Sequence, residues 1–357
     1  MLELDGGDGG GQLVRTALSL SALTGQAIRV ENVRGSRPNR GLRPQHVAAV
    51  EAVGAATDAT LDGVERESDA FSFAPEAVRG GTFTVDVGSA GSATLVCDAV
   101  APLAVALDRP LTLTVRGGTD VKWSPPADFL RHVKLPLLRA VGVRADLSVH
   151  RRGFYPAGGG RLTLTLRPSS PSELRLSNRG PVERLSASAV ASESLESASV
   201  AERMADAVRE RLGGAGTAER PVKATARYVE SDCPGAVVTL VADCGSSRAG
   251  FDAVGERGLP SEDVAGRAVE AFRSWRATGA PVDEHLGDQL LLWVALAGGE
   301  LRLPRVTDHV RTNAETIRAF GYGLRVGDGE ESRTGEETGA DEEDGTGGVV
   351  ATAPSPE

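Results

Sequence analysis

Residues 9–30, "GGGQLVRTALSLSALTGQAIRV", carry the pattern that decides the fold. Glycines open the stretch, an apolar helix-like run follows, Gly25 interrupts it, and a short alternating strand ends it. The pattern returns at 91–115, "GSATLVCDAVAPLAVALDRPLTLTV", and at 287–303, "GDQLLLWVALAGGELRL". A supersecondary unit that recurs along a chain indicates a repeated α/β architecture. In the second copy, Pro102 is expected to kink the helix or to begin a new turn.

The sequence between the second and third copies predicts an inserted domain. Two amphipathic runs, "SVAERMADAVRERLGG" and "SEDVAGRAVEAFRSWRATG", flank the strand candidates "VKATARYVE" and "GAVVTLVAD", and glycine-rich turns are missing there. Further strands are expected at 81–88, 144–150 and 161–168. We therefore predict an α+β protein with a large domain made of residues 1–177 and 279–327 and a smaller α+β domain at 178–278.

Composition places the chain among globular proteins of a reducing compartment. It has 357 residues, of which 40% are hydrophobic and 4% aromatic, so Val, Leu and Ala must fill the interior. The three cysteines show no CxxC pairing, which argues against a structural zinc site or a disulfide framework. Since neither a signal peptide nor an apolar run of membrane-spanning length is visible, we expect a cytoplasmic protein with no membrane contact.

The net charge of −10 is concentrated at one end of the chain. Residues 328–357 hold ten acidic residues and one basic one, Arg333, with almost no large apolar residues, so this segment is expected to form a disordered acidic tail. The remainder carries 39 acidic and 38 basic residues, and only three of the basic residues are lysines. Few lysines and an acidic tail suit a salt-loving organism, although a GC-rich genome also favours Arg and Ala.

The loop "DGGDGGG" (5–11) leads directly into the first predicted helix. Glycines at such a junction let the backbone approach a phosphate, and the exposed N–H groups at the helix start favour an anion. A flexible turn is the plainer interpretation. Asp8 within the loop is either a metal ligand or a helix N-cap.

Four arginines recur every three residues in "VRGSRPNRGLRPQHVAAVEAV" (33–53), where proline and glycine prevent a regular helix. A cluster of guanidiniums ahead of Gln45 and His46 favours a phosphate clamp, because each guanidinium offers fork-shaped donors to phosphate oxygens. The alternative is a solvated basic loop. The clustered residues are Arg34, Arg37, Arg40 and Arg43.

Three further stretches combine polar residues with turns. "GGTDVKWSPPADFLRHV" (117–133) opens into a helix near Ala127, and its prolines either pack on a purine base or only start that helix. "GFYPAGGG" (153–160) is typical of a structural hairpin turn. "DEHLGDQ" (283–289) begins the third repeat helix, and His309 in "RVTDHVRTNAETIRAF" (305–320) is either a nucleophile or a hydrogen-bonded structural residue.

Taken in order, these motifs resemble the RNA 3′-terminal phosphate cyclases. The resemblance covers residues 3–177 and 279–320 and rests on "GGGQLVRTALSLSALTG", "RPQHVAAV", "VDVGSAGSATLV", "GGTDVKWSPPADF", "GFYPAGGG" and "HLGDQLLLWVALAG". It implies three repeated α/β units, each similar to the C-terminal domain of a bacterial translation initiation factor, together with a smaller inserted domain. This agrees with the three repeats and the insert.

The resemblance also implies a reaction. In that family a histidine attacks the α-phosphate of ATP, which gives a covalent enzyme–AMP and releases pyrophosphate. AMP then moves to the RNA 3′-terminal phosphate, and the vicinal 2′-OH displaces it to form a 2′,3′-cyclic phosphate. The implied cofactors are ATP and a divalent cation (Mg²⁺ or Mn²⁺), and the implied partner is an RNA with a 3′-terminal phosphate. Both a monomer and a dimer agree with the sequence.

The resemblance places roles on particular residues. The nucleophile falls on His309, where Asp308 either orients the imidazole or caps the helix. Phosphate and RNA binding fall on Arg15, Arg34, Arg37, Gln45 and His46, and nucleotide binding falls on Pro125, His285, Asp288, Gln289 and Asp98. Three positions depart from the family pattern: Asp8 replaces a metal-contacting Glu in a shorter loop, His285 replaces a stacking aromatic, and Asp98 replaces a nucleotide-contacting Gln.

The alternative function is a non-catalytic cyclase-like RNA-binding factor that acts in ribosome assembly. Such proteins keep the fold and generally lack the nucleophilic histidine. Because His309 is present, the sequence favours the enzyme.

Overall fold

A computed structural model describes residues 1–213, 221–328 and 349–353. Within them, one β-α-β-α-β-β topology recurs three times, each time as a four-stranded sheet. In every copy the first two strands are parallel and joined through a helix, and the last strand inserts antiparallel between the second and the third. The mixed α+β class is therefore as predicted.

The first two copies are continuous in sequence. The first comprises β1 (Leu2–Asp5), α1 (Gly10–Thr24), β2 (Ile28–Glu31), α2 (Pro44–Thr57), β3 (Thr60–Asp62) and β4 (Phe71–Ala74). The second comprises β5 (Gly81–Asp86), α3 (Ala93–Val100), the 3-10 turn η1 (Ala101–Val105), β6 (Leu111–Gly117), α4 (Ala127–Phe129), the π-helical turn η2 (Leu130–Lys134), α5 (Leu135–Ala140), β7 (Ala145–Arg151) and β8 (Gly160–Leu166). The expected effect of Pro102 is confirmed, since α3 ends at Val100 and a new turn begins there.

The third copy corrects the prediction of a disordered tail at 328–357. It consists of β9 (Leu174–Leu176), α8 (Glu284–Ala297), β14 (Gly299–Leu303), α9 (Asp308–Ala319), β15 (Arg325–Asp328) and β16 (Val349–Ala353). β16 lies antiparallel between β14 and β15, so residues 349–353 form a strand inside the sheet. Their run of β-branched valines and threonine supplies the fourth strand that this topology requires. The rest of the predicted tail, 329–348 and 354–357, lies outside the described residues.

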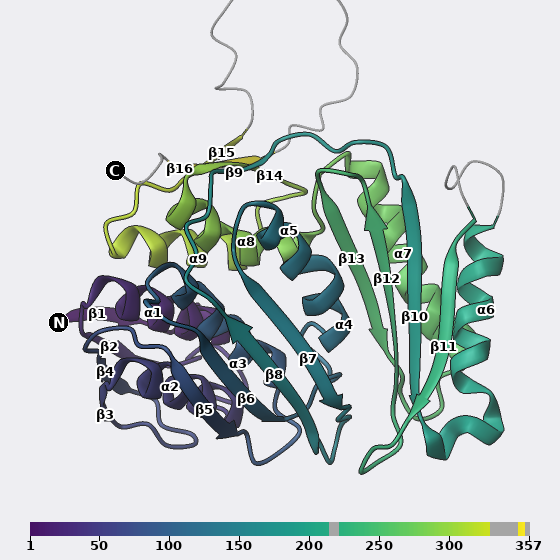
Figure 1. Ribbon diagram of the computed structural model, residues 1–357, viewed down its shortest axis with the longest axis horizontal. Helices are drawn as coiled ribbons and strands as arrows, with labels where there is room; N and C mark the ends of the chain where they lie inside the picture. Colours follow the sequence, from purple (N-terminus) through teal and green to yellow (C-terminus); the bar gives the residue numbers. More distant parts are fainter. Residues whose placement is uncertain (214–220, 329–348, 354–357) are drawn as a thin grey trace, which may run out of the picture.

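The insert interrupts the third copy between β9 and α8. It contains β10 (Arg184–Ser192), the 3-10 turn η3 (Glu193–Ala198), α6 (Val200–Leu212), β11 (Lys223–Val229), β12 (Ala236–Asp243), β13 (Arg248–Val254) and α7 (Ser261–Thr278). Its sheet has the order β11-β10-β12-β13, and α6 and α7 cover one face (Figure 1). A separate hydrophobic core, whose buried members all fall between Leu185 and Trp275, lies under these helices. On this separation we propose that 178–278 is the inserted domain and that 1–177 and 279–327 form the large one.

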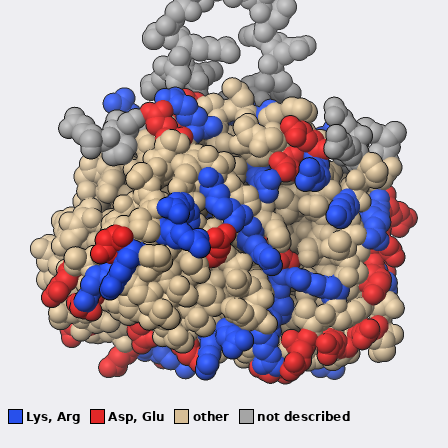
Figure 2. Space-filling model, in the orientation of Figure 1, with Lys and Arg blue, Asp and Glu red and all other residues tan. Residues whose placement is uncertain are grey.

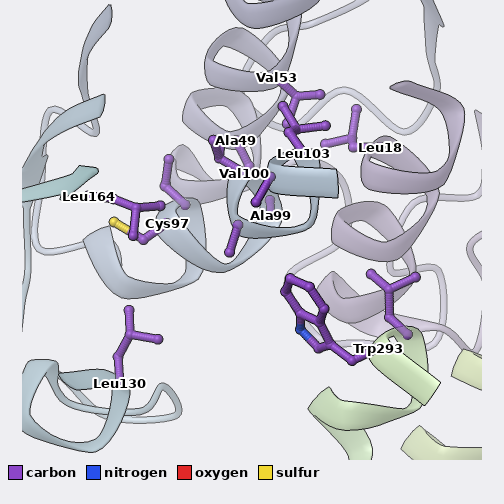
Figure 3. Close-up of a cluster of buried hydrophobic side chains, with 14 of the residues drawn as sticks. Leu18, Ala49, Val53, Cys97, Ala99, Val100, Leu103, Leu130, Leu164 and Trp293 are labelled. Carbon is purple, nitrogen blue, oxygen red and sulfur yellow. The ribbon is translucent and has the colours of Figure 1, made fainter. Parts of the chain in front are cut away.

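The helices of the three copies pack on one another and carry the main core. α1 contacts α2, α3 and α9, and α8 contacts α9. Close packing of small and branched side chains compensates for the scarcity of aromatic residues. Figure 3 shows part of this cluster, in which side chains from several helices converge: Leu18, Ala49, Val53, Ala99, Val100, Leu103 and Trp293.

A buried ionic network holds the insert against the large part of the chain. The Arg152 guanidinium donates to Asp120 (2.8 Å) and to Asp128 (2.5 Å), and the Arg152 side chain is only 2% exposed. Two residues of the insert donate to the large part: Ser188 donates to Asp128 (3.0 Å), and the Gly250 N–H donates to the Asp283 carboxylate (2.9 Å). Because buried charges are costly unless paired, this network fixes the two parts in one arrangement.

In the part of the chain that the structure describes, every helix is too short or too polar to span a lipid bilayer.

Candidate phosphate and nucleotide site

The glycine loop brings the start of α1 against two of the predicted site residues. Gly10 has a φ of 57°, which favours glycine. A Cβ added there would lie 3.7 Å from Nη2 of Arg37 and 3.9 Å from Cε1 of His309. The helix is capped by Gly9 without a side-chain acceptor and has no acidic residue in its first turn, so its exposed N–H groups favour an anion.

His46 lies directly below this loop as a neutral hydrogen-bond donor. Its Nδ1 accepts from the Arg43 N–H (3.0 Å), which leaves the proton on Nε2. A Cβ at Gly11 would come within 2.3 Å of that Nε2, so only glycine permits α1 to approach the ring. Burial, together with the charges of Arg15, Arg34 and Arg43, lowers the pKa of His46 to about 3.

The predicted arginine cluster surrounds the same point. Arg34 lies near both Arg43 and Arg37, because burial, followed by the charges of these two residues, lowers the pKa of Arg34. Arg15 reaches in from α1 and donates to the Gly11 carbonyl (3.1 Å). Of Arg15, Arg34, Arg37 and Arg43, only Arg43 has an ion pair among the described residues, with Glu67 at 3.6 Å. A concentration of unneutralised guanidiniums indicates a binding site for phosphate.

His309 is the second residue of α9 and is exposed to solvent. Partial burial, followed by the charges of Arg37, Arg15 and His285, lowers its pKa, so its imidazole is neutral near pH 7. Thr307 caps α9, because its hydroxyl accepts from the Val310 N–H (3.2 Å). Of the two alternatives for Asp308, the one in which it caps the helix is therefore wrong. Asp308 instead occupies the first turn, where a carboxylate stabilises the helix and partly offsets the lowered pKa of His309.

The predicted nucleotide residues meet in a second group beside the arginines. Asp288 accepts from the Gln12 amide, and its backbone carbonyl accepts from Asn313 (2.9 Å). Burial raises the pKa of Asp288 to about 7, against the opposing charges of Arg15 and Lys134. Pro125 is tied to α3 by its carbonyl, which accepts from Thr94 (2.7 Å) one turn before Asp98.

Lys134 is a member of this group that the sequence analysis missed. It ends the π-helical turn, a feature often found at functional sites, and its side chain is 2% exposed. Its Nζ forms an ion pair with Asp98 and donates to Oε1 of Gln289 (3.1 Å). A cavity of about 20 Å³, room for one water, adjoins Lys134 and is lined by polar and apolar side chains, among them Gln12, Arg15, Thr16, Asp98, Asn313, Pro102, Leu292 and Trp293. Asp98, expected to contact the nucleotide, is thus held by Lys134.

The remaining predicted residues lie at the border of the site. Gln45 accepts from the Ser92 N–H (3.1 Å) and so joins α2 to the loop after β5. His285 is exposed on the first turn of α8, close enough to lower the pKa of His309. Asp8 is exposed in the glycine loop. No group of three or more His, Cys, Asp or Glu among the described residues could hold a metal ion. Asp8 fits a Mg²⁺-like cation only if phosphate oxygens and water supply the other ligands, which is usual for Mg²⁺.

Comparisons with known proteins agree on one family. A family model described as RNA 3′-terminal phosphate cyclase matches residues 6–323. A protein of Halobacterium salinarum with that name is 47% identical over 335 residues, which cover 90% of this chain and 96% of that protein. Proteins of the same name from Ectopseudomonas mendocina and Pyrococcus furiosus are 38% and 36% identical, over 89% and 90% of this chain and 92% and 93% of theirs.

Proposed function

This chain belongs to the RNA 3′-terminal phosphate cyclase family and is a cyclase of that kind, and we propose that His309 is the residue that becomes adenylated. In the proposed first step, a neutral imidazole nitrogen attacks the α-phosphorus of ATP and pyrophosphate leaves. AMP then passes to the RNA 3′-phosphate, the 2′-OH attacks that phosphorus, and AMP leaves as the 2′,3′-cyclic phosphate forms. Activation is needed because a phosphate monoester otherwise has no good leaving group.

The observation that carries this proposal is the position of His309 beside Gly10 and Arg37. An exposed, neutral imidazole is nucleophilic, and its neighbours offer a guanidinium and helix N–H groups for the charge on the attacked phosphate. Arg15, Arg34 and the Nε2–H of His46 supply further donors for phosphate oxygens. A divalent cation held at Asp8 would neutralise phosphate charge when bound.

The second group of residues is proposed to hold the adenosine. The Oε1 of Gln289 is engaged by Lys134, which leaves its amide N–H₂ as the group that can donate to a nucleotide. His285 is exposed and offers a ring for stacking, and the half-buried Pro125 offers an apolar surface. Asp98 would act through Lys134 and Gln289 and would not need to contact the nucleotide itself.

The test is covalent labelling in the absence of RNA. Wild-type protein incubated with α-³²P-ATP and Mg²⁺ should acquire an acid-labile label, and His309→Asn should acquire none. His150→Asn, which changes an exposed histidine on β7, is the matched control and should label fully. Equal labelling of His309→Asn would refute the role of His309. A wild-type protein that neither labels nor cyclises RNA would be a non-catalytic RNA-binding factor.

A further inference from the structure

The sheet of β5, β6, β8 and β7 leaves one face open, and the side chains on that face are arranged in rows. Along each strand, residues on the open face alternate with less exposed residues on the other face, and the strand register places side chains of the open face beside one another. Two rows consist almost wholly of hydroxyl side chains, and Thr114 and Thr163 contact each other at 3.1 Å. These rows are Thr84, Thr114, Thr163 and Ser148, and Thr82, Thr112, Thr165 and Asp146.

The third row is cationic. Arg116 of β6 is paired directly with Arg161 of β8, and Arg161 with Arg151 of β7. Arg151 is neutralised by Glu230 (3.1 Å) and Asp232 (2.9 Å) of the insert. Arg116 and Arg161 are both exposed, and neither has an ion pair in the described parts of the chain. Figure 2 shows that Lys and Arg form a band across this face of the molecule.

Two like charges placed directly opposite each other on neighbouring strands destabilise a sheet. Asp86 precedes Arg116 in the row, yet its carboxylate accepts from the Gly88 N–H (2.8 Å) and forms no ion pair within the described residues. The Arg116–Arg161 pair is thus unfavourable in the free protein. A bound anion would relieve the repulsion, and the neighbouring hydroxyl rows could donate to further polar oxygens.

The arginine row adjoins the candidate site through one short loop. The Val87 N–H donates to the Arg116 carbonyl (2.9 Å), and the Gly118 N–H donates to the Gly91 carbonyl (2.8 Å). At the other end of the same loop, the Ser92 N–H donates to Gln45, next to His46. Loop 88–91 therefore lies between the residues around His46 and the end of the sheet that carries Arg116.

We propose that the open face of the β5–β6–β8–β7 sheet binds the RNA strand on the 5′ side of the terminal phosphate. Arg116 and Arg161 contact consecutive phosphates, and the threonine rows contact ribose and phosphate oxygens. The face has no large apolar side chain, so recognition follows the backbone and is insensitive to base sequence. This inference rests on the proposed function, since it takes RNA with a 3′-phosphate as the substrate.

The test compares a long with a minimal substrate in the Arg116→Gln/Arg161→Gln variant. Binding of a fluorescent RNA of about 20 nucleotides with a 3′-phosphate should weaken about tenfold, and the slope of log K against log salt should fall in magnitude by about 1.4, since each phosphate contact on a single strand contributes roughly 0.7. Cyclisation of a dinucleotide 3′-phosphate and adenylation without RNA should stay at the wild-type level.

The control is Arg184→Gln/Arg211→Gln, which removes the same charge from two exposed arginines of the insert, at the start of β10 and in the last turn of α6. It should leave binding of the long RNA within twofold of wild type. Unchanged binding by the Arg116/Arg161 variant, or an equal loss for both double variants, overturns the inference. Failure of the proposed function is separate, because it would appear as absent labelling in wild-type protein whatever the RNA affinity.

Discussion

Replacing Lys134 by methionine tests whether the buried ion pair of Lys134 and Asp98 beside the site stabilises the fold. The ammonium is 2% exposed and its partner Asp98 is 13% exposed, so the substitution leaves a carboxylate in the interior without its cation. Removing one partner of a buried ion pair costs about 3–5 kcal/mol. At roughly 2 °C per kcal/mol for a chain of this size, the melting temperature should fall by about 6–10 °C.

Two further variants make that experiment decisive. Lys134→Met/Asp98→Leu removes both charges and should recover stability to within about 1 kcal/mol of wild type. Lys122→Met makes the same substitution in an exposed pair with Glu256, where the two side chains are 42% and 39% exposed, and should cost at most about 1 kcal/mol. Thermal and urea unfolding measure all three. A Lys134→Met variant as stable as Lys122→Met would refute the reasoning, as would a double variant no better than Lys134→Met.

Three other predictions concern the site. The pKa of His46 is about 3 in the folded protein and near 6.5 when unfolded, so the stability that its neutral form contributes is lost as pH falls between these values. In His46→Gln, the free energy of unfolding measured with urea should therefore depend less on pH in that range, by up to about 1.4 kcal/mol per pH unit. Arg37→Gln removes a charge that lowers the pKa of His309, so the acid limb of the adenylation rate should move to higher pH, and an unmoved limb would contradict that cause. Gly11→Ala puts a methyl group against the His46 ring and should abolish labelling by ATP while the far-ultraviolet circular dichroism stays native; full labelling would show that the ring has room to move.

The repeated architecture could be predicted because each copy contains the same pattern within one short stretch of sequence. Glycine, apolar helix and alternating strand follow one another within 9–30, 91–115 and 287–303, and the observed sheets have one shared topology. The strand at 349–353 could not be predicted in the same way. Five residues after an acidic segment carry little signal alone, and their strand conformation depends on partners β14 and β15, which are fixed only in the folded sheet.

Some residues of the candidate site could likewise be predicted from the sequence, and others could not. Arg34, Arg37, Gln45 and His46 stand out because they cluster in sequence, and the structure brings Arg37 and His46 to the start of α1. Lys134 gave no such signal, since it lies in "LRHVKLPLLRA" among other basic residues and its partners Asp98 and Gln289 are 36 and 155 residues away. The Arg116–Arg161 pair depends on strand register, which one sequence does not reveal.

The position of β16 determines when the third sheet can be completed during synthesis of the chain. The third sheet joins β9 at 174–176 to β14 at 299–303 and then to β16 at 349–353, so its strands leave the ribosome far apart in time. The first two sheets can close while synthesis continues. β14 can pair with β9 once residue 303 has emerged, but the other edge of β14 and the strand β15 stay unpaired until residue 353 has emerged. We therefore expect nascent chains stopped near residue 328, which lack β16, to be selectively cleaved in the third copy.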